Sequence, residues 1–415
     1  MSPSPPEGFV PPTYPFDRLE PLARIAERHP GGMVDLSVGT PVDPPPPAVV
    51  ATLASSGAER GYPPGVGSVR LLGSCRDWMS RRFGVEVGSR QVAACIGTKE
   101  LVAGIPHWLR LRRPDRSVVL YPEISYPTYA MGALLAGARP VAVPAGPDGA
   151  LDLEAIDEAD AAAALCLWTN SPSNPTGALD DLEAAAAWGR AREVPVLSDE
   201  CYTEMTWDGP PRTILDHGTD GVVAVHSISK RSNAAGLRCG FYAGDEELVH
   251  YLAELRRHAG FMVPGPVQAA AAVALDDDDH VAAQRDRYAR RLRRLVEVLA
   301  LVGIEARRPA GGFYLWVRVD EVPEPLRAAL QTLPGGMPGT GADDAPAWSV
   351  TAALAAAGGV LVSPGDFYGP AGASFVRVAM VAPDERLELV ADRLGALASP
   401  PASGVAARAV VADRG

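Results

Sequence analysis

Residues 222–244 read VVAVHSISKRSNAAGLRCGFYAG, two apolar runs separated by a short polar segment. The runs Val222–His226 and Leu237–Ala243 have the composition of strands. The segment Ser227–Gly236 between them is too short for a helical crossover, which parallel neighbours would need. We therefore expect these two strands to pair antiparallel.

Apolar runs upstream of this pair predict a layered sheet. From about residue 92 to residue 244, runs rich in β-branched residues alternate with helical patterns, which is typical of a mostly parallel sheet covered by helices. The upstream runs are Val92–Ile96, Val118–Tyr121, Pro140–Val143, Ala163–Trp168 and Pro195–Ser198. Together with the first pair they predict an α/β fold with a mostly parallel seven-stranded sheet and one reversed strand.

The C-terminal part of the chain predicts a smaller α+β domain. A long helix is expected over about Asp279–Val302, with arginines on one face and apolar residues on another. Strands are expected within residues 305–320 and 360–380, on either side of a helix. The Gly-, Pro- and Asp-rich stretch 335–346 between them is expected to be a flexible loop.

Proline divides the N-terminal part from the rest of the chain. Residues 1–30 are proline-rich and end in a short helical pattern, which indicates an arm that packs on another part of the protein. The run Pro44–Pro47 stops a helix and favours an extended connector. The expected divisions are an arm with part of the small domain over 1–44, a large domain over 45–275, a small domain over 276–398 and a disordered tail over 399–415.

Composition and charge argue against several classes of protein. The chain has 415 residues, enough for two domains, and 47% of them are hydrophobic, as in ordinary folded proteins. Its net charge of −12 disfavours nucleic acids and anionic membranes as partners, so the arginine-rich run 290–294 is better explained as a solvated helix face. Five scattered cysteines, and no visible secretory signal or long apolar span, lead us to expect a cytoplasmic protein without a metal site.

Lys230 lies among side chains suited to bind a phosphate. Ser227 and Ser229 flank it, and Arg238 follows eight residues later. Hydroxyls are short donors, and Arg offers phosphate a bidentate geometry that Lys cannot. Neighbouring cations also lower the pKa of a lysine, which makes its amine a nucleophile toward aldehydes. In isolation, however, the segment would be interpreted as a polar turn with a surface lysine.

Two more polar motifs follow predicted strands. Asp199 and Tyr202 come directly after the run Pro195–Ser198, at the sheet edge where ligand groups gather. A carboxylate there can pair with a pyridinium nitrogen and keep it protonated. Residues 170–177, NSPSNPTG, follow another strand, and their prolines and glycine fix a turn that presents the Asn174 amide. As structure alone, that segment is simply a loop.

Taken together, the three motifs resemble the fold-type I aminotransferases of class I and II, which carry S-x-S-K…R, D-x-x-Y and N-P-T-G signatures. The resemblance extends from Asp35 to Arg377 and implies that pyridoxal 5'-phosphate is held as a Schiff base on Lys230. The other implied roles are phosphate binding for Ser227, Ser229 and Arg238, pairing with the pyridine nitrogen for Asp199, and contact with the ring hydroxyl oxygen for Asn174 and Tyr202.

The same resemblance implies further cofactor contacts. Gly97, Thr98 and Lys99 match a turn that holds the phosphate at a helix N-terminus, although an ordinary helix start would look the same. Tyr126 matches the catalytic aromatic residue stacked on the cofactor ring, although a lone tyrosine is more often a core residue. Tyr62 matches a tyrosine that reaches the phosphate of the neighbouring subunit, which implies a homodimer with shared sites.

Three residues are implied to bind the substrate. Arg377 matches the arginine that clamps the α-carboxylate through two parallel hydrogen bonds, with a structural salt bridge as the alternative. Gly39 matches a glycine whose backbone closes over that carboxylate, although any glycine in a turn would look similar. Asn174 is expected to contact the substrate as well as the cofactor.

Four longer stretches resemble the actinobacterial succinyldiaminopimelate aminotransferases of lysine biosynthesis. They are residues 35–44, 229–236, 258–268 and 363–370. This resemblance implies amino transfer from N-succinyl-LL-2,6-diaminopimelate to 2-oxoglutarate by a ping-pong mechanism, in which Lys230 moves the α-proton as general base and acid.

Other reactions stay open at this point. A different amino donor, or a β-elimination lyase, could use the same Lys230, Asp199 and Arg377, because these motifs are common to many relatives. A non-catalytic effector-binding module of a transcription regulator is disfavoured, since the roughly thirty residues before Asp35 are too few and too proline-rich for a DNA-binding domain.

Overall fold

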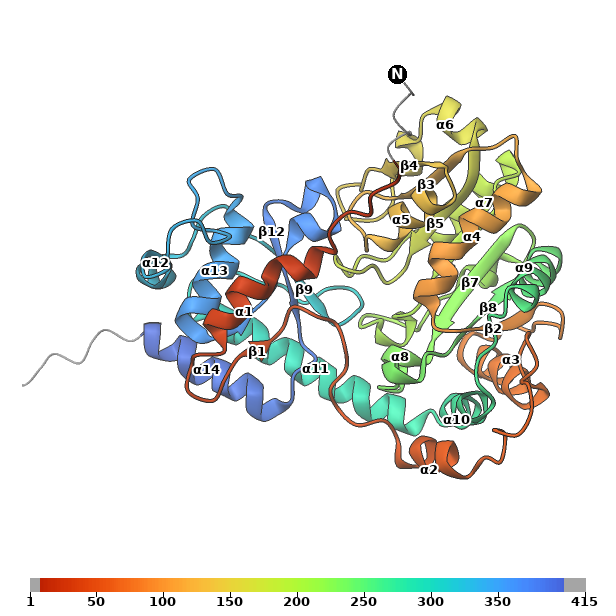
Figure 1. The fold of residues 1–415 in the computed structure, drawn as a ribbon, viewed down its shortest axis with the longest axis horizontal. Helices are drawn as coiled ribbons and strands as arrows, with labels where there is room; N and C mark the ends of the chain where they lie inside the picture. Colours follow the sequence, from red (N-terminus) through yellow and green to blue (C-terminus); the bar gives the residue numbers. More distant parts are fainter. Residues whose placement is uncertain (1–7, 399–415) are drawn as a thin grey trace, which may run out of the picture.

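The computed structural model describes residues 8–398 and contains a seven-stranded sheet (Figure 1). The strand order is β2-β8-β7-β6-β5-β3-β4, and only β8 runs against its two neighbours. The strands are β2 Val92–Cys95, β3 Val118–Pro122, β4 Arg139–Val143, β5 Ala164–Asn170, β6 Val196–Asp199, β7 Val222–Ser227 and β8 Gly240–Gly244. The predicted sheet and its antiparallel pair are confirmed.

The last strand, predicted over Leu237–Ala243, begins later than predicted, at Gly240. Residues Ala235–Leu237 form a 3-10 turn, and Arg238 has a φ of 52°, in the left-handed region. The chain therefore turns before β8 begins at Gly240, so Arg238 lies outside the sheet. Its side chain lies beside Gly97.

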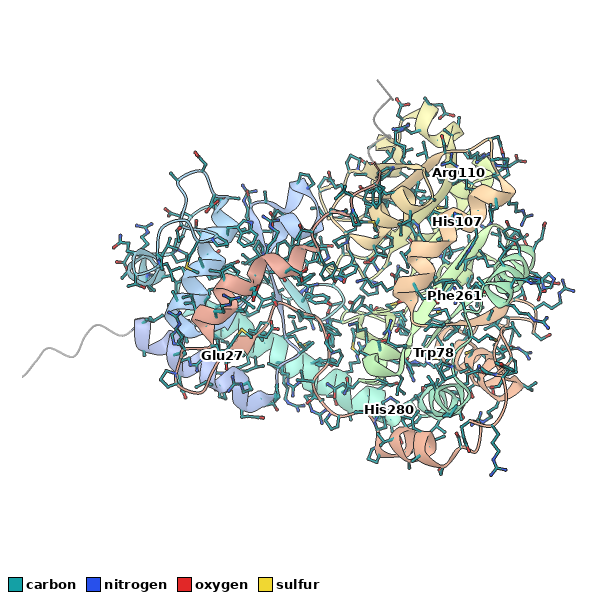
Figure 2. All side chains as sticks on the ribbon, viewed as in Figure 1. Glu27, Trp78, His107, Arg110, Phe261 and His280 are labelled. Atoms are coloured by element: carbon teal, nitrogen blue, oxygen red, sulfur yellow. The ribbon has the colours of Figure 1, made fainter. Side chains whose placement is uncertain are left out.

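Helices cover both faces of the sheet, which explains why its central strands are apolar on both sides. One core layer joins α4, α5 and α9 to the sheet, and the other joins α3, α7 and α10. Figure 2 draws the side chains on the same ribbon, among them Trp78 of α3. The helices are α2 Pro47–Ser55, α3 Val69–Phe83, α4 Thr98–Arg112, α5 Thr128–Leu135, α6 Glu158–Ala162, α7 Leu182–Arg192, α8 Ile228–Arg231, α9 Glu246–His258 and α10 Gly265–Asp276.

A second, smaller group of elements lies beside the large sheet in Figure 1, and α11 extends between the two. It contains a three-stranded antiparallel sheet in the order β11-β12-β9 and a parallel pair, β1 with β10. Its elements are β1 Val34–Asp35, α11 Asp279–Ala300, β9 Tyr314–Arg318, α12 Glu324–Gln331, α13 Pro346–Gly358, β10 Val360–Leu361, β11 Ser363–Pro364, β12 Phe375–Ala379 and α14 Asp384–Ala398. Both predicted strand regions and the long helix are present.

The N-terminal segment packs on this smaller group. It forms a 3-10 helix η1 (Pro15–Leu19) followed by α1 (Glu20–Ala26), whose Leu22 shares a core with Trp348 of α13. The connector after β1 is extended as expected, but Pro47 begins α2, because its fixed φ suits the first turn of a helix. The predicted tail 399–415 lies outside the described residues.

Candidate active site

A cavity of about 330 Å³ lies where the carboxyl ends of β5, β6 and β7 meet the N-terminus of α4 and the smaller group of elements. It brings together most of the residues singled out in the sequence. Those lining it are Gly39, Thr98, Lys99, Tyr126, Asn174, Asp199, Tyr202, Ser227, Ser229, Lys230, Arg238 and Arg377. Residues separated by more than three hundred positions along the chain therefore form one site.

Lys230 lies at the centre of this cavity, on the short helix α8. The Ser227 hydroxyl caps α8 by accepting a hydrogen bond from the Ser229 amide at 3.1 Å, which orients the turn. The Lys230 ammonium contacts the Gly39 carbonyl oxygen. Burial, with Arg377 and Arg238 nearby, lowers the pKa of Lys230 to about 8. With this pKa, about one tenth of the amine is unprotonated, and nucleophilic, at pH 7.

Asp199 ends β6 and is held by two donors. The Tyr129 hydroxyl donates to its Oδ2 at 2.9 Å, and the Cys201 amide donates to its Oδ1 at 3.2 Å. Burial raises the pKa of Asp199, while these hydrogen bonds act in the opposite direction. The donors therefore favour the carboxylate form in a site that would otherwise favour the neutral acid.

Asn174 lies in the loop after β5, and Asn170 holds that loop in place. The Asn170 Oδ1 accepts from the Asn174 amide at 2.8 Å, and its Nδ2 donates to the Asp199 carbonyl oxygen at 2.9 Å. Gly177 closes the loop with a φ of 72°, and a Cβ there would collide with Pro309 and with the backbone. Asn170 thus fixes two site residues at once, a role that we did not predict from the sequence.

The turn before α4 meets Arg238. Gly97 precedes the helix with a φ of 71° and does not itself line the cavity. A Cβ at this position would collide with the Arg238 guanidinium, so only glycine admits that contact. The result is a group of hydroxyl donors and one cation beside a helix N-terminus, which is a chemistry suited to a phosphate.

Arg377 reaches the cavity from β12 of the smaller group and is buried, with 1% of its surface exposed. Its Nη1 donates to Asn174 Oδ1 at 2.8 Å and its Nη2 to the Ser37 carbonyl oxygen, while its Nε has no hydrogen-bond partner within residues 8–398. The guanidinium lies 4.2 Å from the ring centroid of Tyr314. No carboxylate of the described chain neutralises it, which disfavours the alternative of a structural salt bridge.

Tyr126 and Lys99 meet the N-terminal arm at the mouth of the cavity. The Tyr14 and Tyr126 hydroxyls are 2.7 Å apart, and Lys99 Nζ donates to them at 3.3 and 3.4 Å. Phe16 of the arm lines the same cavity. The arm is therefore part of the site, which the helical pattern of the sequence did not indicate.

Tyr202 faces another tyrosine that the sequence analysis missed. Its hydroxyl lies 2.9 Å from that of Tyr314, on β9 of the smaller group. A Cβ at Gly39 would overlap the Tyr314 hydroxyl, so glycine permits the Gly39 backbone to approach Lys230. These contacts hold the smaller group of elements against the strand ends.

The composition of the cavity is unusual in one respect. Of the 38 Lys and Arg residues of the chain, only Lys99 and Lys230 are lysines, and both line this cavity. Tyr62, for which the family resemblance implied a contact with the cofactor phosphate, is 97% exposed and lies outside this cavity.

Within residues 8–398, no helix is long and apolar enough to span a membrane. In the same residues, no three His, Cys, Asp or Glu side chains gather in a way that could hold a metal ion.

A family model for aminotransferases of class I and II matches residues 31–394. The chain belongs to this family. Among its relatives is the probable aminotransferase Rv1178 of Mycobacterium tuberculosis (strain ATCC 25618 / H37Rv), 42% identical over 392 residues, which are 92% of this chain and 85% of that protein. The 4-dedimethylamino-4-oxo-anhydrotetracycline transaminase OxyQ of Streptomyces rimosus is 39% identical over 391 residues, 92% of this chain and 99% of that protein.

Solved aminotransferase structures share the fold. The N-succinyldiaminopimelate aminotransferase of Mycobacterium tuberculosis matches with a TM-score of 0.75 at 28% identity, over 92% of this chain and 99% of that one. Aminotransferases of this class depend on pyridoxal phosphate. The cavity has the chemistry that this cofactor needs, with a buried amine of lowered pKa, a hydroxyl-rich turn with one cation, and a carboxylate held by two donors.

Proposed function

We propose that this aminotransferase takes its amino group from an amino acid that carries a second carboxylate at its far end, foremost N-succinyl-LL-2,6-diaminopimelate, and transfers it to 2-oxoglutarate. Lys99 carries this proposal. Its exposed ammonium stands at the cavity mouth, and within residues 8–398 its hydrogen-bond partners are tyrosines and it forms no ion pair with a carboxylate. An unpaired cation at this point would attract the distal carboxylate of a bound substrate.

The cavity residues divide between cofactor and substrate in this proposal. When bound, pyridoxal phosphate supplies an electron sink for the bonds at the substrate α-carbon. Lys230 would hold it covalently, and Asp199 would keep its ring nitrogen protonated. The phosphate would be held by the backbone amides of Gly97, Thr98 and Lys99, by the Ser227 and Ser229 hydroxyls and by Arg238, so the Lys99 ammonium stays available to the substrate. The ring would be held by Tyr126, and the ring hydroxyl oxygen by Asn174 and Tyr202.

Arg377 and Lys230 would perform the steps on the substrate itself. The Arg377 guanidinium would bind the α-carboxylate, with the Gly39 backbone and Asn174 beside it, and so fix which bond of the α-carbon faces Lys230. The Lys230 amine, whose pKa burial lowers to about 8, would then take the α-proton and return it at a different atom. One residue would thus act as base and then as acid in each half of a ping-pong cycle.

The N-succinyldiaminopimelate aminotransferase among the solved structures supports this substrate, at 28% identity. OxyQ, at 39% identity, favours a second candidate, in which the amino acceptor is a ketone on a polycyclic ring. Tyr14 and Phe16 at the cavity mouth could stack on such a ring system. The two candidates differ in the acceptor, so a comparison of 2-oxoglutarate with a ring ketone separates them.

We also propose a cytoplasmic homodimer. Tyr62 and Val69 are 97% and 91% exposed, which is unusual for large apolar side chains and fits burial against a second subunit. In such a dimer, Tyr62 would reach the phosphate of the neighbouring site.

We place the boundaries of the large domain at residues 45 and 275, with the smaller domain formed by residues 276–398 and the N-terminal arm.

The test is a half-reaction followed by absorbance of the bound cofactor. N-succinyl-LL-2,6-diaminopimelate should convert the visible form to the amine form, and 2-oxoglutarate should restore it. Lys99→Ala should raise the KM for this donor by about tenfold, the size of one lost charge-assisted hydrogen bond, and should affect a donor without a distal carboxylate much less. Lys99→Arg, which keeps the charge, is the matched control. A donor that causes no change, or a Lys99→Ala variant with unchanged KM, would refute the proposed substrate.

A further inference from the structure

A buried polar cluster lies behind the cavity, on the face of the sheet that α3 covers. Glu200 follows Asp199 at the end of β6, and His226 precedes Ser227 at the end of β7. Both side chains are almost completely buried. The His226 ring packs against Trp78, labelled in Figure 2, with ring centroids 5.0 Å apart, and against Phe241 at the same distance.

These two side chains face each other with unsatisfied atoms. Glu200 Oε2 lies 3.4 Å from His226 Nε2, while Glu200 Oε1 accepts from the Ile214 amide at 2.7 Å. Within residues 8–398, Glu200 Oε2 and both ring nitrogens of His226 lack a hydrogen-bond partner of good geometry. Buried polar atoms in folded proteins rarely stay unpaired. A proton between Glu200 and His226, or a buried water, must therefore complete the hydrogen bonds of this cluster.

The charge states follow from the same burial. Burial raises the pKa of Glu200 to about 8 and lowers the pKa of His226 to about 3. At neutral pH the carboxyl group is therefore a donor and the imidazole an acceptor. The ionised groups around this pair are Glu204, Asp216, Arg82 and Arg231. Glu204 forms ion pairs with both arginines, and Arg231 also pairs with Asp278.

A small void adjoins the pair. It measures about 10 Å³, the space of one water molecule, and is lined by Glu200, His226, Glu204 and Arg231 among others. Arg231 Nε is a further unpaired donor here, 3.6 Å from Glu204 Oε1. A water in this void would have at least three polar groups within the lining, as buried waters usually do.

We propose that the Glu200 carboxyl O–H donates to His226 Nε2, that one buried water joins His226 to Arg231 and Glu204, and that this uncharged pair positions Asp199 and Ser227. Glu200 and His226 are direct chain neighbours of the two site residues, on adjacent parallel strands. A hydrogen bond between them fixes the spacing of the two strand ends. The positioning role rests on the proposed function of Asp199 and Ser227, whereas the proton and the water do not.

The first experiment needs neither substrate nor activity. In the ¹⁵N spectrum of histidine-labelled protein at about pH 7, His226 should show one protonated and one unprotonated ring nitrogen. The His226→Gln variant, or the shift caused by Glu200→Gln, assigns its signals among the seven histidines. A high-resolution crystal structure should show one water in the void. Imidazolium signals, or an empty void, would overturn this part of the inference.

The second experiment tests positioning with a matched pair of variants. Glu200→Gln keeps a side-chain N–H donor toward His226, whereas Glu200→Leu removes it. We expect Glu200→Gln to retain most of the activity, and Glu200→Leu to lower kcat by about tenfold or more and to shift the pH midpoint of the cofactor absorbance. If Glu200→Leu does not fold, His226→Leu takes its place, because it removes the acceptor of the same hydrogen bond and should lower kcat and shift the midpoint in the same way. Variants that lose thermal stability but keep the kcat and the midpoint would overturn the positioning role.

Discussion

The Tyr129 hydroxyl, on the first turn of α5, donates a 2.9 Å hydrogen bond to Asp199 Oδ2. Burial raises the pKa of Asp199, and this donor counteracts that effect. A residue outside the strand that carries Asp199 therefore lowers the pKa of this carboxyl group against the effect of burial.

Tyr129→Phe should weaken catalysis while the protein stays folded. The loss of one hydrogen bond to a charged group is worth about 1.5 kcal/mol, so we expect kcat to fall by about tenfold. Steady-state kinetics with thermal unfolding as the control would measure this. Asp199→Ala should cause a much larger fall, and a Tyr129→Phe variant with wild-type kcat would show that Asp199 needs no support from Tyr129.

The cofactor-free protein should gain stability when Lys230 is replaced. Burial lowers the pKa of Lys230 from 10.5 to about 8, so between these values the folded chain binds fewer protons than the unfolded chain. The destabilisation is fully present below about pH 8 and disappears as the pH rises toward 10.5. Lys230→Met should therefore raise the free energy of unfolding at pH 7 by up to about 3 kcal/mol, and by little near pH 10.5.

Denaturant unfolding at both pH values measures that difference, with Lys99→Met as the control for loss of a lysine. A gain that is equal at both pH values would contradict the assignment of a lowered pKa. In the cofactor-loaded enzyme, Lys230→Met should lack turnover, because the same amine is proposed to move the α-proton.

Asn170→Ala should misplace Asn174. It removes the acceptor for the Asn174 amide and the donor to the Asp199 carbonyl oxygen. Since Asn174 contacts Arg377, we expect a rise in the KM of the amino acid of about tenfold, with a smaller change in kcat. Asn170→Asp keeps only the acceptor, so kinetics of this variant should fall between wild type and Asn170→Ala.

Tyr62 offers a test of shared sites. Lys230→Ala subunits should be inactive, and Tyr62→Phe subunits should hold the cofactor less well. If Tyr62 serves the neighbouring site, a mixed dimer contains one site with both defects and one with neither. Mixing and subunit exchange should then increase activity per Tyr62→Phe subunit. Activity that stays the simple average of the two preparations would argue for independent sites.

Much of the fold could be predicted because its strands are continuous apolar runs with polar motifs at their ends. The strand ends also placed Lys230, Asp199 and Asn174 near one another, since parallel strands deliver their carboxyl ends to one edge. Pattern reasoning failed at Leu237–Cys239, because a left-handed residue at Arg238 gives no hydrophobic signal.

The residues that we missed reach the cavity from distant parts of the chain. Tyr14 belongs to the arm and Tyr314 to β9, and neither lies in a motif near a strand end of the large sheet. Only the packing of the smaller group against that sheet reveals them. Asn170 stood inside the quoted motif 170–177, and Tyr129 lies three residues after the predicted Tyr126. Their roles depend on hydrogen bonds to other elements of the fold, which a sequence does not display.

The two lysines of the cavity have a practical consequence for work with this protein. Because the chain has no other side-chain amines, amine-directed labels, acylating agents and cross-linkers would react only at the cavity and at the N-terminal α-amine. Immobilisation through lysine would therefore block substrate entry, and coupling through carboxylates is preferable. Conversely, the amount of an amine-reactive dye that the protein takes up beyond the one equivalent at the α-amine would report whether the cavity is open or filled.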